Sequence, residues 1–306
     1  MKMLNLIAAL TVALTSASFG GSTRATAQDM ALTFDDLPAH NALPAGTTRL
    51  AVIARIAAAL SEAGAPPSYG FINASSAGEA ENARVLELWR ASGNRFGNHT
   101  WSHINLAETS VETYIDQITR NEPLLATLSP DADWRWFRYP YLSEGDTPAK
   151  RAAVREFLSA HHYKVASATL SFDDYAWNQP YARCADKGNQ AGIAALEASY
   201  LAFARETLLS ARQMSQALHG RQIPLVLLMH VGAFDAHMMP ALLAMYREEG
   251  VRFVTLETAQ ADAFYAADLG SKSSAAPLYL ETAMTEKGLT PPERTPVFAA
   301  LEAACR

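Results

Sequence analysis

Short apolar segments alternate along the chain with longer segments of helical periodicity. Each short segment is rich in β-branched or aromatic residues, which is typical of buried strands. The predicted strands are residues 30–34, 68–73, 94–98, 134–139, 164–170, 224–229 and 251–256.

The longer segments carry apolar residues every three or four positions, so each predicts a helix with one apolar face. Gly64 and Gly93 follow the first two of them and predict where those helices end. Pro123 predicts a break or kink inside the third helix. The predicted helices are residues 48–63, 79–92, 111–128, 147–161, 192–219 and 240–249.

Seven strands that alternate with helices predict an α/β fold with a parallel sheet, closed or nearly closed by its crossover connections. The 306 residues allow a barrel of about seven or eight strands. Past residue 268 the stretch GSKSSAAP has the composition of a linker. We therefore expect one domain at residues 28–269 and a tail at residues 270–306 that packs on the outside of the barrel.

The first 27 residues differ from the rest of the chain. Lys2 precedes the apolar run LNLIAALTVAL, and the sequence ATA at residues 25–27 fits a small-x-small cleavage site. This pattern predicts a signal peptide that is cleaved after Ala27, and hence a secreted or periplasmic protein. The alternative, an N-terminal core helix, is disfavoured by the Gly/Ser/Thr-rich stretch at residues 19–26.

The charge balance narrows the classes of partner. The chain has 25 basic and 31 acidic residues, and cleavage would leave 23 basic against the same 31, a net charge of about −8. An acidic chain without basic blocks argues against nucleic acid and anionic membrane surfaces as partners. No later apolar segment is long enough to span a bilayer.

The chain has two cysteines, Cys184 and Cys305. In an oxidising compartment they could form a disulfide that ties the C-terminal tail to the domain. Two free or buried thiols are the alternative, and the sequence favours neither.

Unusual polar groups follow five of the predicted strands. They are Asp35 and Asp36, then NHTWSH, RYPY, SFDDYAW and finally His230. Because active sites in parallel α/β barrels lie at the carboxyl ends of the strands, we expect these groups to meet at one edge.

His99 and His103 lie four residues apart, so they project from one face if the turn after the third strand is helical. Together with Asp35 or Asp36 they form a set of two histidines and one carboxylate, which suits a catalytic zinc ion. Each piece also has an ordinary explanation. A double Asp often caps a helix or forms a turn, and such a histidine pair often lies on an exposed helix.

These five motifs resemble, in order and rough spacing, those of the polysaccharide deacetylases. This is the NodB-homology group, carbohydrate esterase family four, and the resemblance runs from about residue 31 to residue 261. It implies a distorted (β/α)7 barrel and one divalent metal ion, with Zn²⁺ expected and Co²⁺ or Ni²⁺ as alternatives. It also implies an acetylated carbohydrate as the substrate.

The resemblance assigns roles to the residues of the motifs. Asp35 resembles the catalytic base of the family, and His230 resembles the general acid. Asp36, His99 and His103 resemble the three metal ligands.

The remaining matched positions resemble residues around the reacting groups. Arg138 resembles the arginine that holds the base, and Asp173 the acid that pairs with that arginine. Tyr141 resembles the residue whose backbone N–H helps to bind the oxyanion. Trp177 and Leu228 resemble two walls of the acetyl pocket.

The fourth motif departs from the family pattern. Ala176 stands where an Asp usually precedes the Trp, and Asp174 could take the role given to Asp173. His40 lies close in sequence to Asp36 and could touch substrate, but a loop histidine exposed to solvent is the favoured interpretation.

The implied function is the removal of N-acetyl groups from an amino-sugar polysaccharide or oligosaccharide. An O-acetyl esterase or a non-sugar amidase would use the same residues. A carbohydrate-binding pseudoenzyme is less favoured, because the base, the ligands, the arginine and the acid are all present. The sequence specifies neither the polysaccharide nor the oligomeric state.

Overall fold

A computed structural model describes residues 27–38, 40–268 and 279–306. The described chain has a parallel sheet of seven strands, as the hydrophobic pattern predicts. The strands are β1 (Gln28–Leu37), β2 (Tyr69–Ile72), β3 (Arg95–Asn98), β4 (Trp136–Phe137), β5 (Lys164–Val165), β6 (Leu225–His230) and β7 (Val251–Val254).

The strand order β5-β4-β3-β2-β1-β6 places β1 in the interior of the sheet. β7 pairs with the first residues of β1, and β2 pairs with its last residues. Beyond β5 the chain reaches β6 through a parallel bridge between Leu170 and Leu227, so the sheet curls on itself. This curled half-barrel of parallel strands confirms the expected α/β class and the expected distorted barrel.

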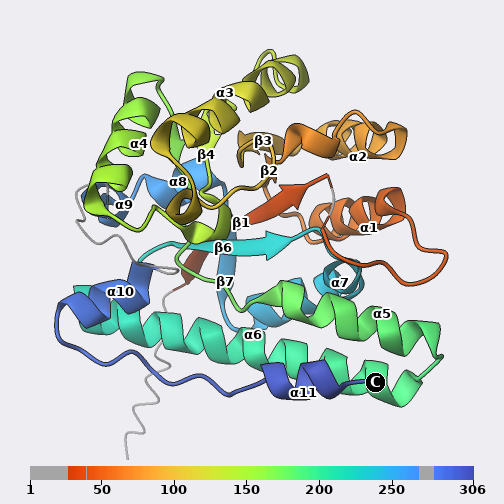
Figure 1. Cartoon of the computed structure of the whole chain (residues 1–306). Helices are drawn as coiled ribbons and strands as arrows, with labels where there is room; N and C mark the ends of the chain where they lie inside the picture. Colours follow the sequence, from red (N-terminus) through yellow and green to blue (C-terminus); the bar gives the residue numbers. More distant parts are fainter. Residues whose placement is uncertain (1–26, 39, 269–278) are drawn as a thin grey trace, which may run out of the picture.

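Helices cover the outside of the curled sheet, and the long helix α6 runs past β6 and β7 (Figure 1). The principal helices are α1 (Arg49–Glu62), α2 (Ala80–Ala91), α3 (Val111–Leu128), α4 (Pro148–Ala160), α5 (Asn178–Asp186), α6 (Gln190–His219) and α7 (Ala233–Glu248). Shorter helices follow: α8 (Leu256–Gln260), α9 (Ala263–Asp268), α10 (Tyr279–Glu286) and α11 (Phe298–Ala303). Four 3₁₀ turns, η1 (Ala74–Ser76), η2 (Leu106–Glu108), η3 (Pro140–Leu142) and η4 (Asp174–Trp177), lie in the loops after strands or between helices.

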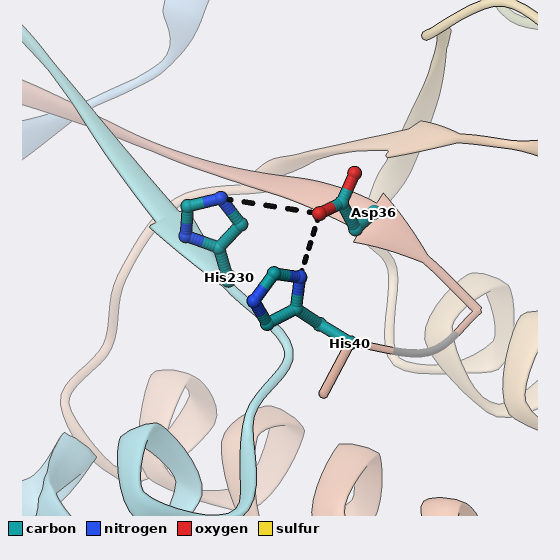
Figure 2. A group of neighbouring side chains, drawn as sticks. All are labelled: Asp36, His40 and His230. Carbon is teal, nitrogen blue, oxygen red and sulfur yellow. Dashed lines mark hydrogen bonds and ion pairs between the residues drawn. The ribbon is translucent and has the colours of Figure 1, made fainter. Parts of the chain in front are cut away.

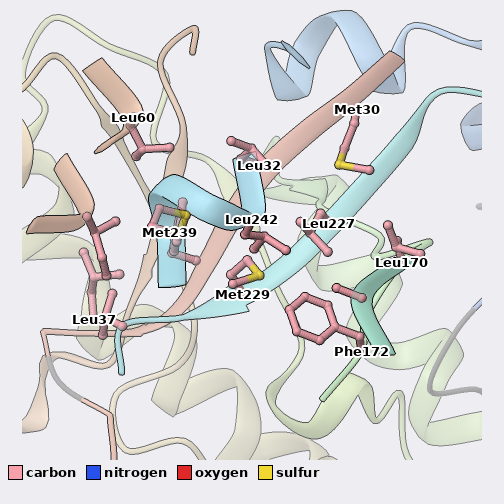
Figure 3. Close-up of a cluster of buried hydrophobic side chains, with 14 of the residues drawn as sticks. Met30, Leu32, Leu37, Leu60, Leu170, Phe172, Leu227, Met229, Met239 and Leu242 are labelled. Atoms are coloured by element: carbon pink, nitrogen blue, oxygen red, sulfur yellow. The ribbon is translucent and has the colours of Figure 1, made fainter. Parts of the chain in front are cut away.

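The core lies between the central strands and the surrounding helices (Figure 3). β1 and β6 are buried along most of their length, because helices or neighbouring strands cover both faces. Met229 of β6 and Leu242 of α7 are fully buried in this cluster. This packing fixes the two strands that carry Asp35 and His230.

Three element predictions need correction. A break or kink was predicted at Pro123, but α3 continues through this residue without a break. α7 begins at Ala233, well before the predicted residue 240, because the side chain of Asn178 accepts the N–H of Phe234 in its first turn. The predicted strand 164–170 is regular only in β5, and the rest of it joins the sheet through the single bridge at Leu170.

The C-terminal residues pack on the helical layer beneath the sheet. α10 lies along α6, and α11 lies against α5 (Figure 1). Cys184 of α5 forms a disulfide with Cys305, which resolves the two alternatives left open by the sequence.

The predicted signal peptide falls almost wholly on residues 1–26, which lie outside the described residues, as do residues 269–278 at the expected start of the tail. The signal peptide and the domain limits therefore stay predictions. Among the described helices, none is long and apolar enough to cross a membrane.

Candidate active site

A cavity of about 390 Å³ opens at the carboxyl ends of the strands. Its walls combine carboxylates and imidazoles with a few apolar side chains. The lining residues are Asp35, Asp36, His40, His99, His103, Tyr141, Leu142, Ser171, Asp173, Tyr175, Leu228 and His230. Nine of the ten residues predicted for the site therefore line this cavity or, for Arg138, contact a residue that does.

The last residues of β1 present two carboxylates to this cavity. Asp35 pairs in register with His230 of β6, so the base and acid candidates lie on adjacent strands. Asp36 has a positive φ of 62°, which turns its side chain differently from a regular strand residue. Side chains of consecutive strand residues normally point to opposite faces, and this turn lets both carboxylates face the cavity.

His99 and His103 meet at the site through a loop rather than a helical turn. Thr100 and His103 both have positive φ, 66° and 56°, so the backbone here cannot be α-helical. The side chain of Asn98 accepts the N–H of Thr100 and supports this conformation. The histidine pair converges as predicted, although the helical turn that was the stated condition for this does not form.

Three side chains surround a point at which a metal ion could bind. His99 Nε2 and His103 Nε2 lie 3.4 and 3.3 Å from Asp36 Oδ1. Tetrahedral coordination with bonds of about 2.0–2.1 Å separates ligand atoms by about 3.3 Å. Asp36 Oδ1 is also buried, and within the described part of the chain it has no hydrogen-bond partner. An orphaned carboxylate oxygen at this spacing from two imidazole nitrogens fits a divalent metal.

The protonation states also favour coordination. Burial would raise the pKa of Asp36, but the hydrogen bond from His40, the nearby His99 and the charge of His230 hold it well below its usual value. Burial and the neighbouring His99 lower the pKa of His103 to about 4, so its imidazole is neutral at pH 7. His99 Nδ1 lies 2.7 Å from the carbonyl oxygen of Arg138, to which it can donate, leaving Nε2 as the ligand atom.

Arg138 holds Asp35 in place. Its Nη1 lies 3.4 Å from both carboxylate oxygens of Asp35, and its Nη2 donates to the hydroxyl of Thr33. The side chains of Arg138 and Asp35 are both almost fully buried. A carboxylate buried this far from solvent stays ionised only beside an opposite charge, and the guanidinium of Arg138 supplies that charge.

Asp174 fixes the orientation and charge of His230. Its two oxygens accept the backbone N–H of His230 at 2.7 Å and contact Nδ1 at 2.9 Å. Burial would lower the pKa of His230, but the charge and hydrogen bond of Asp174, with the charges of Asp36 and Asp35, raise it to about 10. His230 is therefore cationic at neutral pH, with Nε2 directed toward the cavity.

Asp173 occupies a different place from its neighbour. It lines the cavity in a left-handed conformation, and burial raises its pKa against the opposing charge of Arg294. Its expected pairing with Arg138 stays a prediction. The alternative position, Asp174, is the acid with the defined contact, to His230.

His40 is not the solvated loop histidine expected from the sequence. Figure 2 shows its ring beside that of His230, with both histidines directed at the same oxygen of Asp36. His40 Nδ1 lies 2.6 Å from Asp36 Oδ2, and the His230 Nε2 lies 4.0 Å from it. The only sequence signal for this contact was the spacing of four residues between Asp36 and His40.

The apolar walls differ in part from expectation. Leu228 and Tyr141 line the cavity, and the exposed Tyr141 ring lies 4.5 Å from that of His103. Trp177 is fully buried, donates to Ser199 and does not line this cavity, so its expected place in the wall is wrong. Tyr175, two residues earlier, lines the cavity instead.

The fold and this cavity define a parallel α/β protein with a two-histidine, one-carboxylate centre at the carboxyl ends of its strands. The family model described as Polysaccharide deacetylase matches residues 22–158, which include Asp35, Asp36, His99, His103 and Arg138. Over these residues the chain is similar to the polysaccharide deacetylase family, which agrees with the resemblance of the motifs. No curated protein sequence matches the chain.

Solved structures with a similar fold include a chitin deacetylase from Colletotrichum lindemuthianum (18% identity, 77% of this chain and 88% of that one, TM-score 0.53). A polysaccharide deacetylase from Bacillus cereus is also similar (19% identity, 74% and 91% covered, TM-score 0.53). A third is a CE4 family pseudoenzyme from Bacillus anthracis (15% identity, 74% and 63% covered, TM-score 0.50). At these identities the likeness concerns the fold.

Proposed function

We propose that the chain is a metal-dependent deacetylase that removes N-acetyl groups from an amino-sugar polysaccharide or oligosaccharide. One observation carries the proposal: the buried Oδ1 of Asp36, which has no hydrogen-bond partner among the described residues, lies 3.4 and 3.3 Å from the Nε2 atoms of His99 and His103. This candidate centre lies between an Asp–Arg pair and a cationic histidine. Such a site has a place for a metal, a base and an acid.

Asp36, His99 and His103 would hold the metal, with Zn²⁺ proposed for this donor set and Co²⁺ or Ni²⁺ as alternatives. When bound, a divalent metal acts as a Lewis acid and makes water a nucleophile at neutral pH. Asp35 is placed to accept the proton of the attacking water, since its Oδ2 lies 3.8 Å from His99 Nε2, within the candidate centre. Arg138 holds that carboxylate in place.

His230 supplies the proton for the leaving group. An amine leaves readily only after it is protonated, and the imidazolium of His230 points into the cavity with Asp174 behind it. Following the resemblance of the motifs, we assign the backbone N–H of Tyr141 to the oxyanion and Leu228 to the acetyl pocket, and both residues line the cavity. Asp173 also lines this cavity, and we propose that its carboxyl group faces the substrate.

The proposal extends to the location of the protein. The pattern of residues 1–27 supports export to the periplasm or the medium, and the disulfide between Cys184 and Cys305 is consistent with an oxidising compartment. Expression of the whole gene followed by N-terminal sequencing of exported protein should give Gln28 as the first residue. Protein that keeps Met1 and stays inside the cell would contradict export.

Acetate release from a substrate panel tests the activity. The panel contains chitin oligomers, peptidoglycan, poly-N-acetylglucosamine and acetylxylan, each with and without a chelator. We expect release from at least one N-acetylated substrate, its loss with chelator, and its return with Zn²⁺. Release from acetylxylan alone would favour the esterase, and chelator-insensitive release would exclude the metal mechanism.

A matched pair of variants tests the base. Asp35→Asn keeps the shape of the side chain but cannot accept the proton, so kcat should fall by about 10²–10⁴-fold. Asp116→Asn, at an exposed position of α3, should leave kcat unchanged. Full activity of Asp35→Asn would remove Asp35 from its proposed role.

A further inference from the structure

We propose that His40 is a positioning residue that holds the carboxylate of Asp36 so that it offers a single oxygen to the metal. The inference rests on the proposed metal site of Asp36, His99 and His103. It concerns a histidine four residues beyond Asp36, which belongs to none of the five motifs. His40 contacts Oδ2 of Asp36, the oxygen that does not face His99 and His103.

The two oxygens of Asp36 have separate partners. Oδ1 faces His99 and His103, whereas Oδ2 lies 2.6 Å from His40 Nδ1. A carboxylate rotates about its last bond unless each oxygen is held, and a rotated carboxylate could bind a metal through both oxygens. The contact of His40 with Oδ2 removes this freedom and leaves Oδ1 for coordination.

Asn41 determines which nitrogen of His40 carries the proton. The amide nitrogen of Asn41 can only donate, and it lies 2.7 Å from His40 Nε2, which must therefore accept. With Nε2 accepting this hydrogen bond, Nδ1 carries the ring proton and donates it to Asp36 Oδ2. The direction of the hydrogen bond thus follows from the neighbouring residue.

The ring of His40 is also held by packing. It lies 4.5 Å from the ring of His230 and 6.3 Å from that of Tyr175. The side-chain amide of Asn41 also reaches the backbone carbonyl of Tyr175. The loop after β1 is therefore fixed to the loop after β5, and the His40 donor keeps a constant direction toward Asp36.

Distances separate this role from that of a ligand to a second metal ion. Asp36, His40 and His230 are close enough to form a second possible metal group. However, Asp36 Oδ2 lies 2.6 Å from His40 and 4.0 Å from His230. The ligand atoms of a tetrahedral metal site would lie about 3.3 Å apart. The separation from His40 is therefore too short, and the separation from His230 is too long. The short one has the length of a charge-assisted hydrogen bond.

Partners of metal-binding residues typically change metal affinity by about 10–100-fold when they are removed. We therefore expect His40→Ala to weaken Zn²⁺ binding by about 10–100-fold, measured by competition with a chromophoric chelator. His40→Asn should recover much of the affinity, because its amide nitrogen stands where Nδ1 stands. His161→Ala, at the exposed end of α4, should bind Zn²⁺ like the wild type.

Stoichiometry and spectra complete the experiment. Wild type and all variants should bind one equivalent of metal by equilibrium dialysis. The visible spectrum of the Co²⁺ form should change in His40→Ala and return toward that of the wild type in His40→Asn. Circular dichroism and thermal melting verify that each variant is folded, and should His40→Ala fail to fold, His40→Asn is compared with His40→Leu.

The outcomes separate this inference from the proposed function. Unchanged affinity and spectrum in His40→Ala overturn the positioning role while leaving the metal site intact. Two equivalents in the wild type, one of them lost in His40→Ala, overturn it in favour of a second metal ion. A wild-type protein that binds no metal at all overturns the proposed centre itself.

Discussion

At the scale of single residues, the pair of His230 and Asp174 determines the pH range of the proposed reaction. The cation of His230 is the acid of the proposed mechanism, and the charge and hydrogen bond of Asp174 are the largest contributions that raise its pKa, to about 10. The acid is therefore protonated below about pH 10 and is lost as the pH rises through that value. Activity should fall on the alkaline side for this reason.

Asp174→Asn should move this alkaline limb to lower pH. Without the carboxylate, burial dominates and the pKa of His230 falls, by about 1–3 units for the loss of one close opposite charge. The pH profile of kcat for the metal-loaded variant should then decline nearer neutrality, and kcat at pH 8 should fall while the acidic limb moves little. The exposed Asp116→Asn serves as the control, and an unmoved alkaline limb in Asp174→Asn would contradict the assignment.

Residue types at strand ends were predictable from the sequence, whereas their contacts were not. Metal chemistry selected His99 and His103 together with Asp35 or Asp36, and the resemblance of the motifs then selected Asp36. These three residues do converge. Which acid meets His230 was not predictable, since Asp173 and Asp174 are adjacent and differ only in backbone conformation. Asp173 has a φ of 56°, and this turn directs its neighbour inward to His230.

At the scale of elements, the start of α7 is tied to the active-site loop. Asn178, at the beginning of α5, accepts the N–H of Phe234 and donates to the buried Asp235. Gly232 precedes the helix, and a Cβ at this position would lie 2.1 Å from the Asn178 amide. The helix can therefore begin at Ala233 only while residue 232 has no side chain.

Gly232→Ala should lower the free energy of unfolding by about 2–3 kcal/mol. The added methyl group displaces the Asn178 side chain, which leaves buried polar groups without partners at a typical cost of about 1–3 kcal/mol each. Urea unfolding followed by circular dichroism measures the change. Gly78→Ala is the matched control, because a Cβ there meets nothing within 4 Å. Equal midpoints for the two variants would show that the Asn178 contacts are not needed for stability.

Elements with strong patterns were predicted better than the connections between them. The period of the apolar residues fixed the existence of the strands and helices, because burial of one face requires that period. The conformation of the loop of Thr100 and His103 was not predictable, since left-handed residues other than glycine leave no clear trace in a sequence. The early start of α7 depends on Asn178, more than fifty residues away in the chain.

At the scale of the whole molecule, the sheet brings together residues from five distant strand ends. Parallel pairing places Asp35 beside His230, although 195 residues separate them in sequence. The alternation of strands and helices predicted a common edge, but the pairing register came only from the structure. The order β5-β4-β3-β2-β1-β6 puts the base candidate on an interior strand. His230 ends the adjacent β6, whereas Arg138 and His99 follow β4 and β3 on the other side of β1.

The disulfide closes the molecule at its C-terminal end. Cys184 and Cys305 are 121 residues apart, and the adjacent Arg183 donates to the carbonyls of Leu301, Glu302 and Ala304. Cross-linking so long a segment restricts the unfolded chain, and a disulfide typically stabilises a protein by about 2–4 kcal/mol. The bond lies on the helical layer and lines no part of the catalytic cavity.

Replacing both cysteines by Ser should therefore lower stability more than activity. We expect the double variant to lose about 2–4 kcal/mol in urea unfolding and to retain most of its kcat at 25 °C. Wild-type protein treated with a reductant should unfold at the same urea concentration as the variant, and the variant should not respond to the reductant. Equal stability of the oxidised wild type and the double variant would mean that the Arg183 contacts alone hold the C-terminus. A parallel loss of kcat would instead show that loss of the disulfide displaces α5. That displacement would move the adjoining η4, and with it Asp174 and His230.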